Sequence, residues 1–316
     1  MSDPPSMRSL VEDYLAYRRG LGFQLRNTGP LLLRFAEYAD RTGHHGPLTT
    51  ELALGWARLP AQASPTYVSN RLDAVRCFAR YRAIFDPGTE VPPRGLIGSV
   101  QRRPAPYIYT EAELAALLAA AGRLSQGVGL RPHTYVALFG LLACTGLRIS
   151  EALGLARQDV DWQQGLLTIR RSKFRKTRLV PLHPSATQAL QAYAQQRDRA
   201  HPIAAADAFF LTTRGTPLRR LTAEATFRQL RQQVSLSAQG GRRPPRIHDI
   251  RHTFVCRRLL RWYEEGIDID HAIAALSTYL GHGEVTDTYW YLTAIPDLME
   301  LATARFERFA SVRLGD

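Results

Sequence analysis

The sequence predicts a mainly α-helical protein with a small antiparallel β-sheet, divided into two domains. Most apolar residues recur at intervals of three and four, the period of an amphipathic helix. Residues 159–182 change to the period of two that is typical of paired strands. Residues 86–106 are rich in proline and glycine, which favours a break between two sets of helices. A length of 316 residues suits two domains better than one.

The first domain, residues 1–98, is expected to consist of short helices. The first helix carries an apolar stripe that the following glycines end, made of Leu10, Val11, Tyr14 and Leu15. The other helices are expected to begin near Pro30, at Thr49 and at the Ser64–Pro65 cap. On the last of them Arg76 and Arg80 lie four residues apart, where they would either hold phosphates or face solvent.

The linker is expected at residues 99–106, with Arg102 and Arg103 placing positive charge between the two domains. The second domain then covers residues 107–316. Its first helix is expected to start at Thr110, because Glu113 three residues later completes a capping box.

A basic hairpin interrupts the helices of the second domain. Leu167 and Ile169 alternate on one strand, and Leu179, with Val180 and Leu182, lies on the return. Six cations fall within residues 170–178 between the strands. Such a cluster indicates either an anionic partner or a solvated hairpin tip. Helices are expected again after Pro184.

The charge balance points to a polyanionic partner. The chain has 41 Lys and Arg against 28 Asp and Glu, a formal net charge of +13. This excess favours nucleic acid over the alternative of a merely basic protein. Hydrophobic residues make up 45 %, enough for packed cores.

Targeting and cysteine signals are weak. The N-terminus lacks a signal-peptide pattern and no apolar run approaches the length of a membrane span, so a cytoplasmic protein is expected. Cys77, Cys144 and Cys256 are far apart, form no metal-ligand pattern and are expected to be buried and reduced.

The chemistry-bearing residues suit phosphoryl transfer without a metal. Its transition state spreads negative charge over phosphate oxygens, and arginine binds these through two parallel hydrogen bonds. Tyr291 is the candidate nucleophile, although consecutive aromatics there are often core residues. The other candidates each have a plainer alternative as a surface or structural residue, and they are Arg148, Lys173, His248, Arg251 and His282, with Glu151 placed to orient Arg148.

These residues occur in motifs that resemble the tyrosine recombinases, the phage integrase family, over nearly the full length. The motifs are CTGLRISE from Cys144, RLVPL from Arg178, HDIRHTF from His248 and LGH from Leu280. The spacing of nine residues after His282 selects Tyr291 rather than Tyr289, and hairpin alignment selects Lys173 rather than Lys176.

The resemblance implies a site-specific DNA recombinase that needs neither metal nor ATP nor another cofactor. Tyr291 would form a 3′-phosphotyrosyl link, Arg148, Arg251 and His282 would stabilise the phosphorane, His248 would manage the tyrosine proton and Lys173 would protonate the 5′ oxygen. The fold implied is a helical core-binding (SAM-like) domain followed by the catalytic domain.

The expected partner is double-stranded DNA, bound by a homotetramer at two sites and assisted by accessory recombination proteins. The tetramer would be joined by exchange of a C-terminal helix at residues 295–310, which has an apolar stripe but could also pack on its own domain. Candidate DNA contacts are Arg76, Arg80, Arg102, Arg103, Arg171, Arg175, Lys176 and Arg243.

Residues 266–281 are longer than is usual in the family, and the segments around His282 and Tyr291 look most like the branch of transposases and mobile elements. Two alternatives remain open. One is a type IB topoisomerase-like enzyme that rejoins the same DNA ends. The other is a DNA-binding accessory protein without catalysis.

Overall fold

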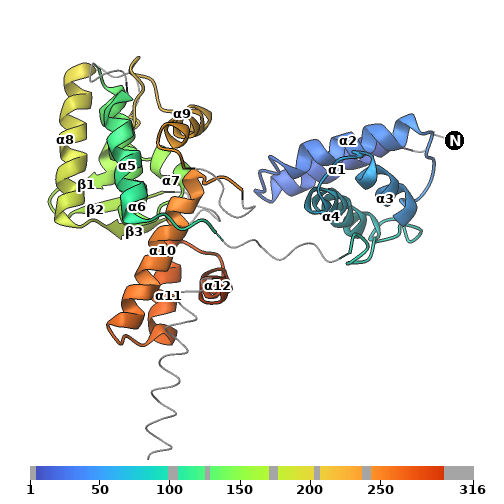
Figure 1. The fold of residues 1–316 in the computed structure, drawn as a ribbon. Helices are drawn as coiled ribbons and strands as arrows, with labels where there is room; N and C mark the ends of the chain where they lie inside the picture. Colours follow the sequence, from blue (N-terminus) through green and yellow to red (C-terminus); the bar gives the residue numbers. More distant parts are fainter. Residues whose placement is uncertain are drawn as a thin grey trace, which may run out of the picture. The chain divides into compact units, whose positions relative to one another are not determined.

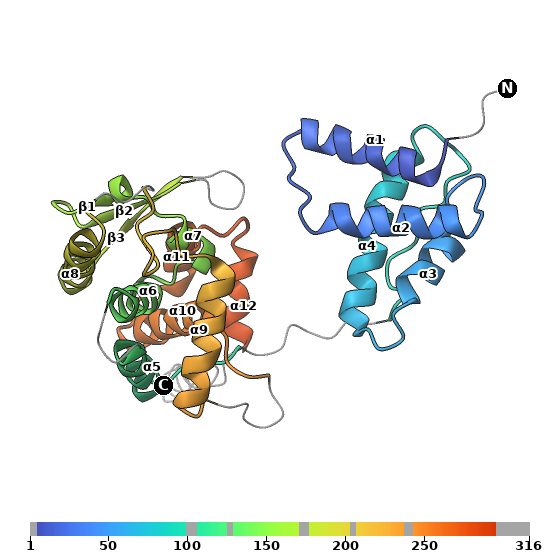
Figure 2. The same cartoon turned by 90° about the horizontal axis from the view of Figure 1, so that it is seen from above.

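The computed structural model describes residues 5–98, 106–124, 129–170, 177–202, 207–236 and 243–294. The chain divides into two compact units, Met1–Pro104 and Ala105–Asp316. It is mainly helical with a three-stranded antiparallel sheet (Figures 1 and 2), which confirms the predicted fold class. The predicted C-terminal helix at 295–310 and most of the predicted linker lie outside the described residues.

The helices of the first unit are α1 (Met7–Gly20), α2 (Thr28–Arg41), α3 (Thr50–Arg58) and α4 (Pro65–Arg82). Helix α4 packs against the other three and completes a core around Phe35, Trp56 and Phe78. Its start follows the predicted cap, since the Ser64 side chain accepts a hydrogen bond from the backbone N–H of Tyr67 at 3.3 Å.

Arg76 does not lie on a solvated face of α4, which corrects its predicted role as a phosphate contact. Its side chain is buried and donates from Nε to the carbonyl of Pro92 at 2.7 Å and from Nη2 to that of Pro93 at 2.9 Å. A further hydrogen bond joins Arg76 to Asp73. Arg76 therefore ties the segment after α4 to the helix, while Arg80, one turn later, is exposed.

The second unit contains α5 (Glu111–Gly122), α6 (Arg131–Thr145), α7 (Ile149–Leu153), β1 (Val160–Asp161), β2 (Leu166–Ile169), β3 (Arg178–Pro181), α8 (Pro184–Ala200), α9 (Arg220–Gln233), α10 (Ile247–Glu264), α11 (Ile269–Leu280) and α12 (Thr286–Ala294). Helix α6 is apolar on most sides and packs against α5, α8 and α10. It forms the centre of this unit's main core. The predicted capping box of Thr110 and Glu113 is present at the start of α5.

The sheet has the order β1-β2-β3, with Leu167 opposite both Val160 and Val180. These side chains are buried, whereas Leu179 is 58 % exposed. Because side chains of a strand alternate between its faces, Val180 is the inward residue and Leu179 is not. Strand β1 was not predicted, since it has only two residues.

Helices α10, α11 and α12 enclose a separate small core that includes Val255, Leu259, Leu276 and Tyr291. Cys256 is also buried there, as predicted, but Cys77 and Cys144 are exposed and the prediction for them was wrong. No helix among the described residues is long and apolar enough to cross a membrane.

Gly146 lies where the end of α6 meets α10. It ends α6 with a φ of +63°, a conformation that glycine adopts without strain. A Cβ atom built there would overlap the ring of Phe254 from α10. Glycine therefore lets α10 approach the end of α6, close to the segment that carries Arg148.

We expect Gly146→Ala to lower the free energy of unfolding by at least about 2 kcal/mol, from the backbone strain and the overlap combined. Gly140→Ala is the matched control, because its Cβ in the middle of α6 would meet nothing within 4 Å. That change should be neutral or stabilise by up to about 1 kcal/mol. Urea unfolding measures the free energy of unfolding of both variants. Equal effects of the two substitutions would contradict the close packing of Phe254 on Gly146.

Candidate active site

Two arginine side chains from distant parts of the sequence meet at one backbone carbonyl. Arg148, immediately before α7, donates from Nη1 to the carbonyl oxygen of Leu280 at 3.3 Å. Arg251 in α10 donates from Nη2 to the same oxygen at 2.9 Å, and from Nη1 to the carbonyl of Gly146 at 2.7 Å. The last turn of α11 therefore fixes the spacing of the two guanidinium groups.

A buried carboxylate holds Arg148 from the other side. Glu151 accepts from Arg148 Nη1 at 3.0 Å, and from Arg178 Nη1 and Nη2 at 3.1 and 2.9 Å. The Glu151 side chain is only 5 % exposed, so this is not an ordinary surface pair. Burial alone would raise the pKa of Glu151, but the hydrogen bonds from Arg178 and Arg148 outweigh it and hold that pKa below its usual value.

Gly281 allows the end of α11 to reach this cluster. It ends the helix with a φ of +66°, and its carbonyl accepts from Arg148 Nη1 at 3.1 Å. A Cβ at this position would lie 2.7 Å from Nη1 of Arg178. Gly281 therefore lets the backbone approach Arg148 and Arg178, and His282 follows directly after it.

Arg251 keeps its charge despite burial. It is 3 % exposed, and burial followed by the nearby charge of Arg148 lowers its pKa to about 10. It is therefore protonated near pH 7. Two like charges held this close favour an anion between or beside them.

His248 is neutral near pH 7. The packing around its ring, followed by the charges of Arg251 and Arg246, lowers its pKa to about 4. One nitrogen of the neutral imidazole can donate a hydrogen bond while the other accepts one. Because Arg251 lies three residues further along α10, both side chains project to one side of the helix.

Tyr291 lies in α12 at the edge of this cluster, where it interacts electrostatically with Arg251. It is 3 % exposed, and its hydroxyl makes a 2.7 Å hydrogen bond with Nδ1 of His252. His282 makes a 2.7 Å hydrogen bond from its Nδ1 to the hydroxyl of Thr288. The phenol thus lies near the arginines but contacts an imidazole that the sequence reading did not single out.

A basic hollow of about 600 Å³ opens beside the cluster, between the start of α10 and helix α9. The neutral His248 lines it together with six charged residues, Arg148, Arg220, Glu224, Arg228, Arg231 and Arg246. Glu224 is paired with Arg220 at 2.7 Å, which leaves a strong excess of positive charge. Of the guanidinium nitrogens of Arg148, Nη1 alone makes hydrogen bonds to described residues. Its other N–H groups are therefore available to an anion.

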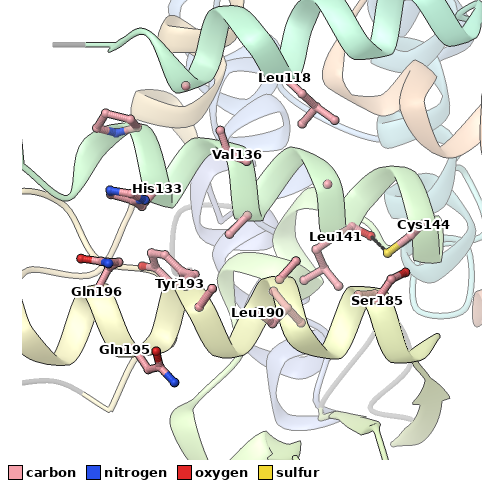
Figure 3. Close-up of a pocket in the computed structure, with 17 residues that line it drawn as sticks. Leu118, His133, Val136, Leu141, Cys144, Ser185, Leu190, Tyr193, Gln195 and Gln196 are labelled. Atoms are coloured by element: carbon pink, nitrogen blue, oxygen red, sulfur yellow. Dashed lines mark hydrogen bonds between the residues drawn. The ribbon is translucent and has the colours of Figure 1, made fainter. Parts of the chain in front are cut away.

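A second hollow, of about 620 Å³, lies between α6 and α8 (Figure 3). Side chains such as Leu118, Val136, Leu141 and Leu190 make it largely apolar, and His133 lies at its edge. It lacks the clustered arginines of the basic hollow. The arginines that line the basic hollow make it the better match for an anionic ligand.

The structure brings together Arg148, His248, Arg251, His282 and Tyr291, with Glu151 in support. Arg243 is exposed just before α10. Other predicted residues lie outside the described ranges, namely Arg102, Arg103, Arg171, Lys173, Arg175 and Lys176. Among the described residues, no three His, Cys, Asp or Glu side chains are grouped to hold a metal ion.

Sequence reasoning missed Arg178, His252 and the arginines of α9. Arg178 was counted only as one cation of the hairpin. On α9, Arg220, Arg228 and Arg231 recur at intervals compatible with one helix face, a signal that could have been used. His252 lies four residues after His248, so the two share a face as well.

Residues 108–296 match the model described as Phage integrase family. The chain is 43 % identical over 309 residues to the putative integrase/recombinase y4rB of Sinorhizobium fredii, covering 96 % of this chain and 98 % of that protein. It is 33 % identical to the tyrosine recombinase XerC of Chlamydia caviae, over 71 % of this chain and 66 % of that protein.

Two solved structures share the fold at low sequence identity. The Tn1549 transposon integrase in complex with transposon right-end DNA is 20 % identical, with a TM-score of 0.70 over 97 % of this chain and 100 % of that one. The XerH recombinase bound to a palindromic difH substrate is 18 % identical, with a TM-score of 0.69 over 95 % and 85 %.

We expect Glu151→Gln to destabilise the protein by about 3 kcal/mol or more at pH 7, since it leaves buried cations without their counter-charge. The lowered pKa of Glu151 means that its ionised form stabilises the fold. This contribution is complete above the unfolded pKa of about 4.5 and is lost as the pH falls through the folded value. The difference in the free energy of unfolding between wild type and Glu151→Gln should therefore become smaller below pH 4.5.

Denaturant unfolding at several pH values measures this gap. Glu265→Gln is the control, because Glu265, directly after α10, forms an exposed ion pair with Arg261 that should contribute little to stability. A gap for Glu151→Gln that widens at low pH would contradict the assignment.

Proposed function

This chain belongs to the phage integrase family and is a tyrosine site-specific recombinase, and we propose that Tyr291 is the nucleophile with which it cleaves and rejoins duplex DNA. The observation that carries the proposal is the meeting of Arg148 and Arg251 at the Leu280 carbonyl, with the Tyr291 phenol beside them. Two fixed cations next to a nucleophile suit a phosphodiester.

In the cleavage step the phenolic oxygen of Tyr291 attacks phosphorus and forms a P–O bond. The bond from phosphorus to the 5′ oxygen breaks, which leaves a 3′-phosphotyrosyl link and a free 5′-hydroxyl. Rejoining is the reverse attack by a 5′-hydroxyl from a second DNA. One phosphate ester replaces another in each step, so no ATP is required.

The arginines supply the electrostatic part of catalysis. The planar fork of an arginine matches two phosphate oxygens, and hydrogen bonds hold both side chains in place before DNA arrives. His282, directly after Gly281, adds a third donor to the developing negative charge. Fixed donors of this kind cost no reorganisation during the reaction, and removing one typically slows catalysis about 10²–10³-fold.

Lys173 is the proposed donor of the proton that the 5′ oxygen needs. It lies between β2 and β3, and β3 also carries Arg178 of the arginine cluster. A lysine ammonium group can give its proton to the leaving oxygen and take one back during rejoining. His248, neutral near pH 7, is the proposed hydrogen-bond partner of a phosphate oxygen or of the nucleophile.

Duplex DNA is the proposed partner of the basic hollow and of the first unit. Arg80, Arg102, Arg103, Arg171, Arg175, Lys176 and Arg243 are the proposed further contacts, together with the α9 arginines. We propose that four protomers act on two DNA sites, joined through residues 295–310 and helped by accessory proteins. The site of action would be the bacterial nucleoid in the cytoplasm.

The proposed biological role is movement of a mobile element by integration, excision or transposition. The similarity to the putative integrase/recombinase y4rB and the shared fold with the Tn1549 transposon integrase support this role. The alternative of topoisomerase-like relaxation uses the same chemistry. Relaxation of a plasmid without a recombination site, and no strand exchange between two sites, would favour that alternative.

We expect Tyr291→Phe to bind DNA like the wild type but to form no covalent adduct on a nicked suicide substrate, even with EDTA present. The phenyl ring keeps the packing but lacks the attacking oxygen. Tyr289→Phe is the matched control, since Tyr289 is 40 % exposed two residues away, and its adduct yield should not change. Denaturing gel electrophoresis detects the adduct, and an adduct in Tyr291→Phe would remove Tyr291 from the proposed role.

We expect Arg148→Lys to slow adduct formation by about 10²-fold or more, because lysine keeps the charge but cannot form two parallel hydrogen bonds. The affinity for DNA should change by less than about tenfold, since the net charge is preserved. Arg261→Lys is the control, on an exposed face of α10. Adduct formation within a few-fold of wild type in Arg148→Lys would argue against transition-state binding by this arginine.

A further inference from the structure

The hydroxyl of Tyr291 and Nδ1 of His252 form a 2.7 Å hydrogen bond between α12 and α10. The two residues are 3 % and 7 % exposed, so water has little access to this bond. A distance of 2.7 Å is at the short end for an oxygen and a nitrogen. In the tautomer of His252 that leaves Nδ1 unprotonated, the phenol donates this hydrogen bond to the imidazole.

The His252 ring is held firmly in this position. Its centroid lies 4.8 Å from that of His248 in an edge-to-face contact, and 5.9 Å from the Trp290 ring. The centroid of the Tyr291 ring lies 5.4 Å from that of the His252 ring. Aromatic groups on both helices thus fix the direction in which Nδ1 points.

His248 is less suited to take the phenolic proton. Its pKa is lowered to about 4, which makes it a weak base toward a phenol of pKa about 10. It also lines the basic hollow, where a phosphate oxygen would reach it. His248 and His252 therefore face different partners although they share one helix face.

We propose that His252 is the proton acceptor for Tyr291 during DNA cleavage, an inference that rests on the proposed role of Tyr291 as nucleophile. Nδ1 touches the reacting oxygen and has the geometry to take its proton as the bond to phosphorus forms. Arg251, adjacent in sequence to His252, interacts electrostatically with Tyr291 and favours negative charge on the phenolic oxygen.

Proton transfer accompanies both cleavage and rejoining. During cleavage the phenolic O–H bond breaks, its proton passes to His252 Nδ1, the P–O bond to Tyr291 forms and the P–O5′ bond breaks. The 5′ oxygen takes its proton from Lys173. During rejoining the 5′-hydroxyl gives its proton to Lys173 and its oxygen forms the P–O5′ bond. The P–O bond to Tyr291 breaks, and the phenolate recovers its proton from His252.

The main test is His252→Asn, assayed for adduct formation on the nicked suicide substrate. The asparagine Oδ1 can occupy the place of Nδ1 and accept the hydrogen bond, but it cannot take the proton. We expect adduct formation to slow by about 10²-fold or more, with DNA affinity unchanged. His271→Asn is the matched control, because the His271 side chain is 90 % exposed in α11.

Substitution of a fluorinated tyrosine at position 291 separates proton transfer from a structural role. Its phenol loses the proton more readily, so it should restore much of the rate of His252→Asn. It should not restore Arg148→Lys, whose defect lies in phosphate binding. If His252 only packs against Tyr291, fluorination would leave the His252→Asn rate unchanged, which would overturn the proposal.

His252→Ala gives a second test that does not depend on asparagine folding well at this site. It removes the imidazole, and added imidazole should restore adduct formation in this variant but not in Arg148→Lys. Rates within about threefold of wild type in His252→Asn or His252→Ala without any rescue would overturn the proposal. Absence of a Tyr291 adduct in the wild type would instead overturn the proposed function, so the two failures are distinguishable.

Discussion

The carbonyl oxygen of Leu280 is the point on which the candidate active site depends. It accepts hydrogen bonds from both Arg148 and Arg251, and so joins the start of α7, the first turns of α10 and the end of α11. These segments are far apart in sequence and meet only when the second unit folds. Gly146 and Gly281 make the approach possible by ending their helices in a left-handed conformation.

Holding two cations this close has an electrostatic cost that the surrounding structure offsets. The pKa of Arg251 is lowered first by burial and then by the charge of Arg148, and the buried carboxylate of Glu151 compensates for part of this cost. A phosphate placed beside the arginines would relieve the remaining repulsion. The same arrangement therefore favours an anion at the place where charge develops in the proposed reaction.

The sequence was sufficient for the fold class and the main helices, because helical periodicity and caps are local signals. Motif spacing also selected Arg148, Arg251 and Tyr291 as candidates. The sequence did not predict the role of residues whose contacts depend on how the helices pack. Arg76 has the spacing of a surface residue, but its guanidinium satisfies the carbonyls of Pro92 and Pro93. His252 could not be assigned either, since its contact with Tyr291 depends on how α10 and α12 pack.

The most direct measurement is a crystal structure of the protein with nicked duplex DNA and orthovanadate, which mimics the phosphorane. The account predicts a bond from the Tyr291 oxygen to vanadium, with nitrogens of Arg148 and Arg251 within about 3.2 Å of vanadate oxygens. Vanadate bound elsewhere, without contacts to these two arginines, would contradict the proposed active site.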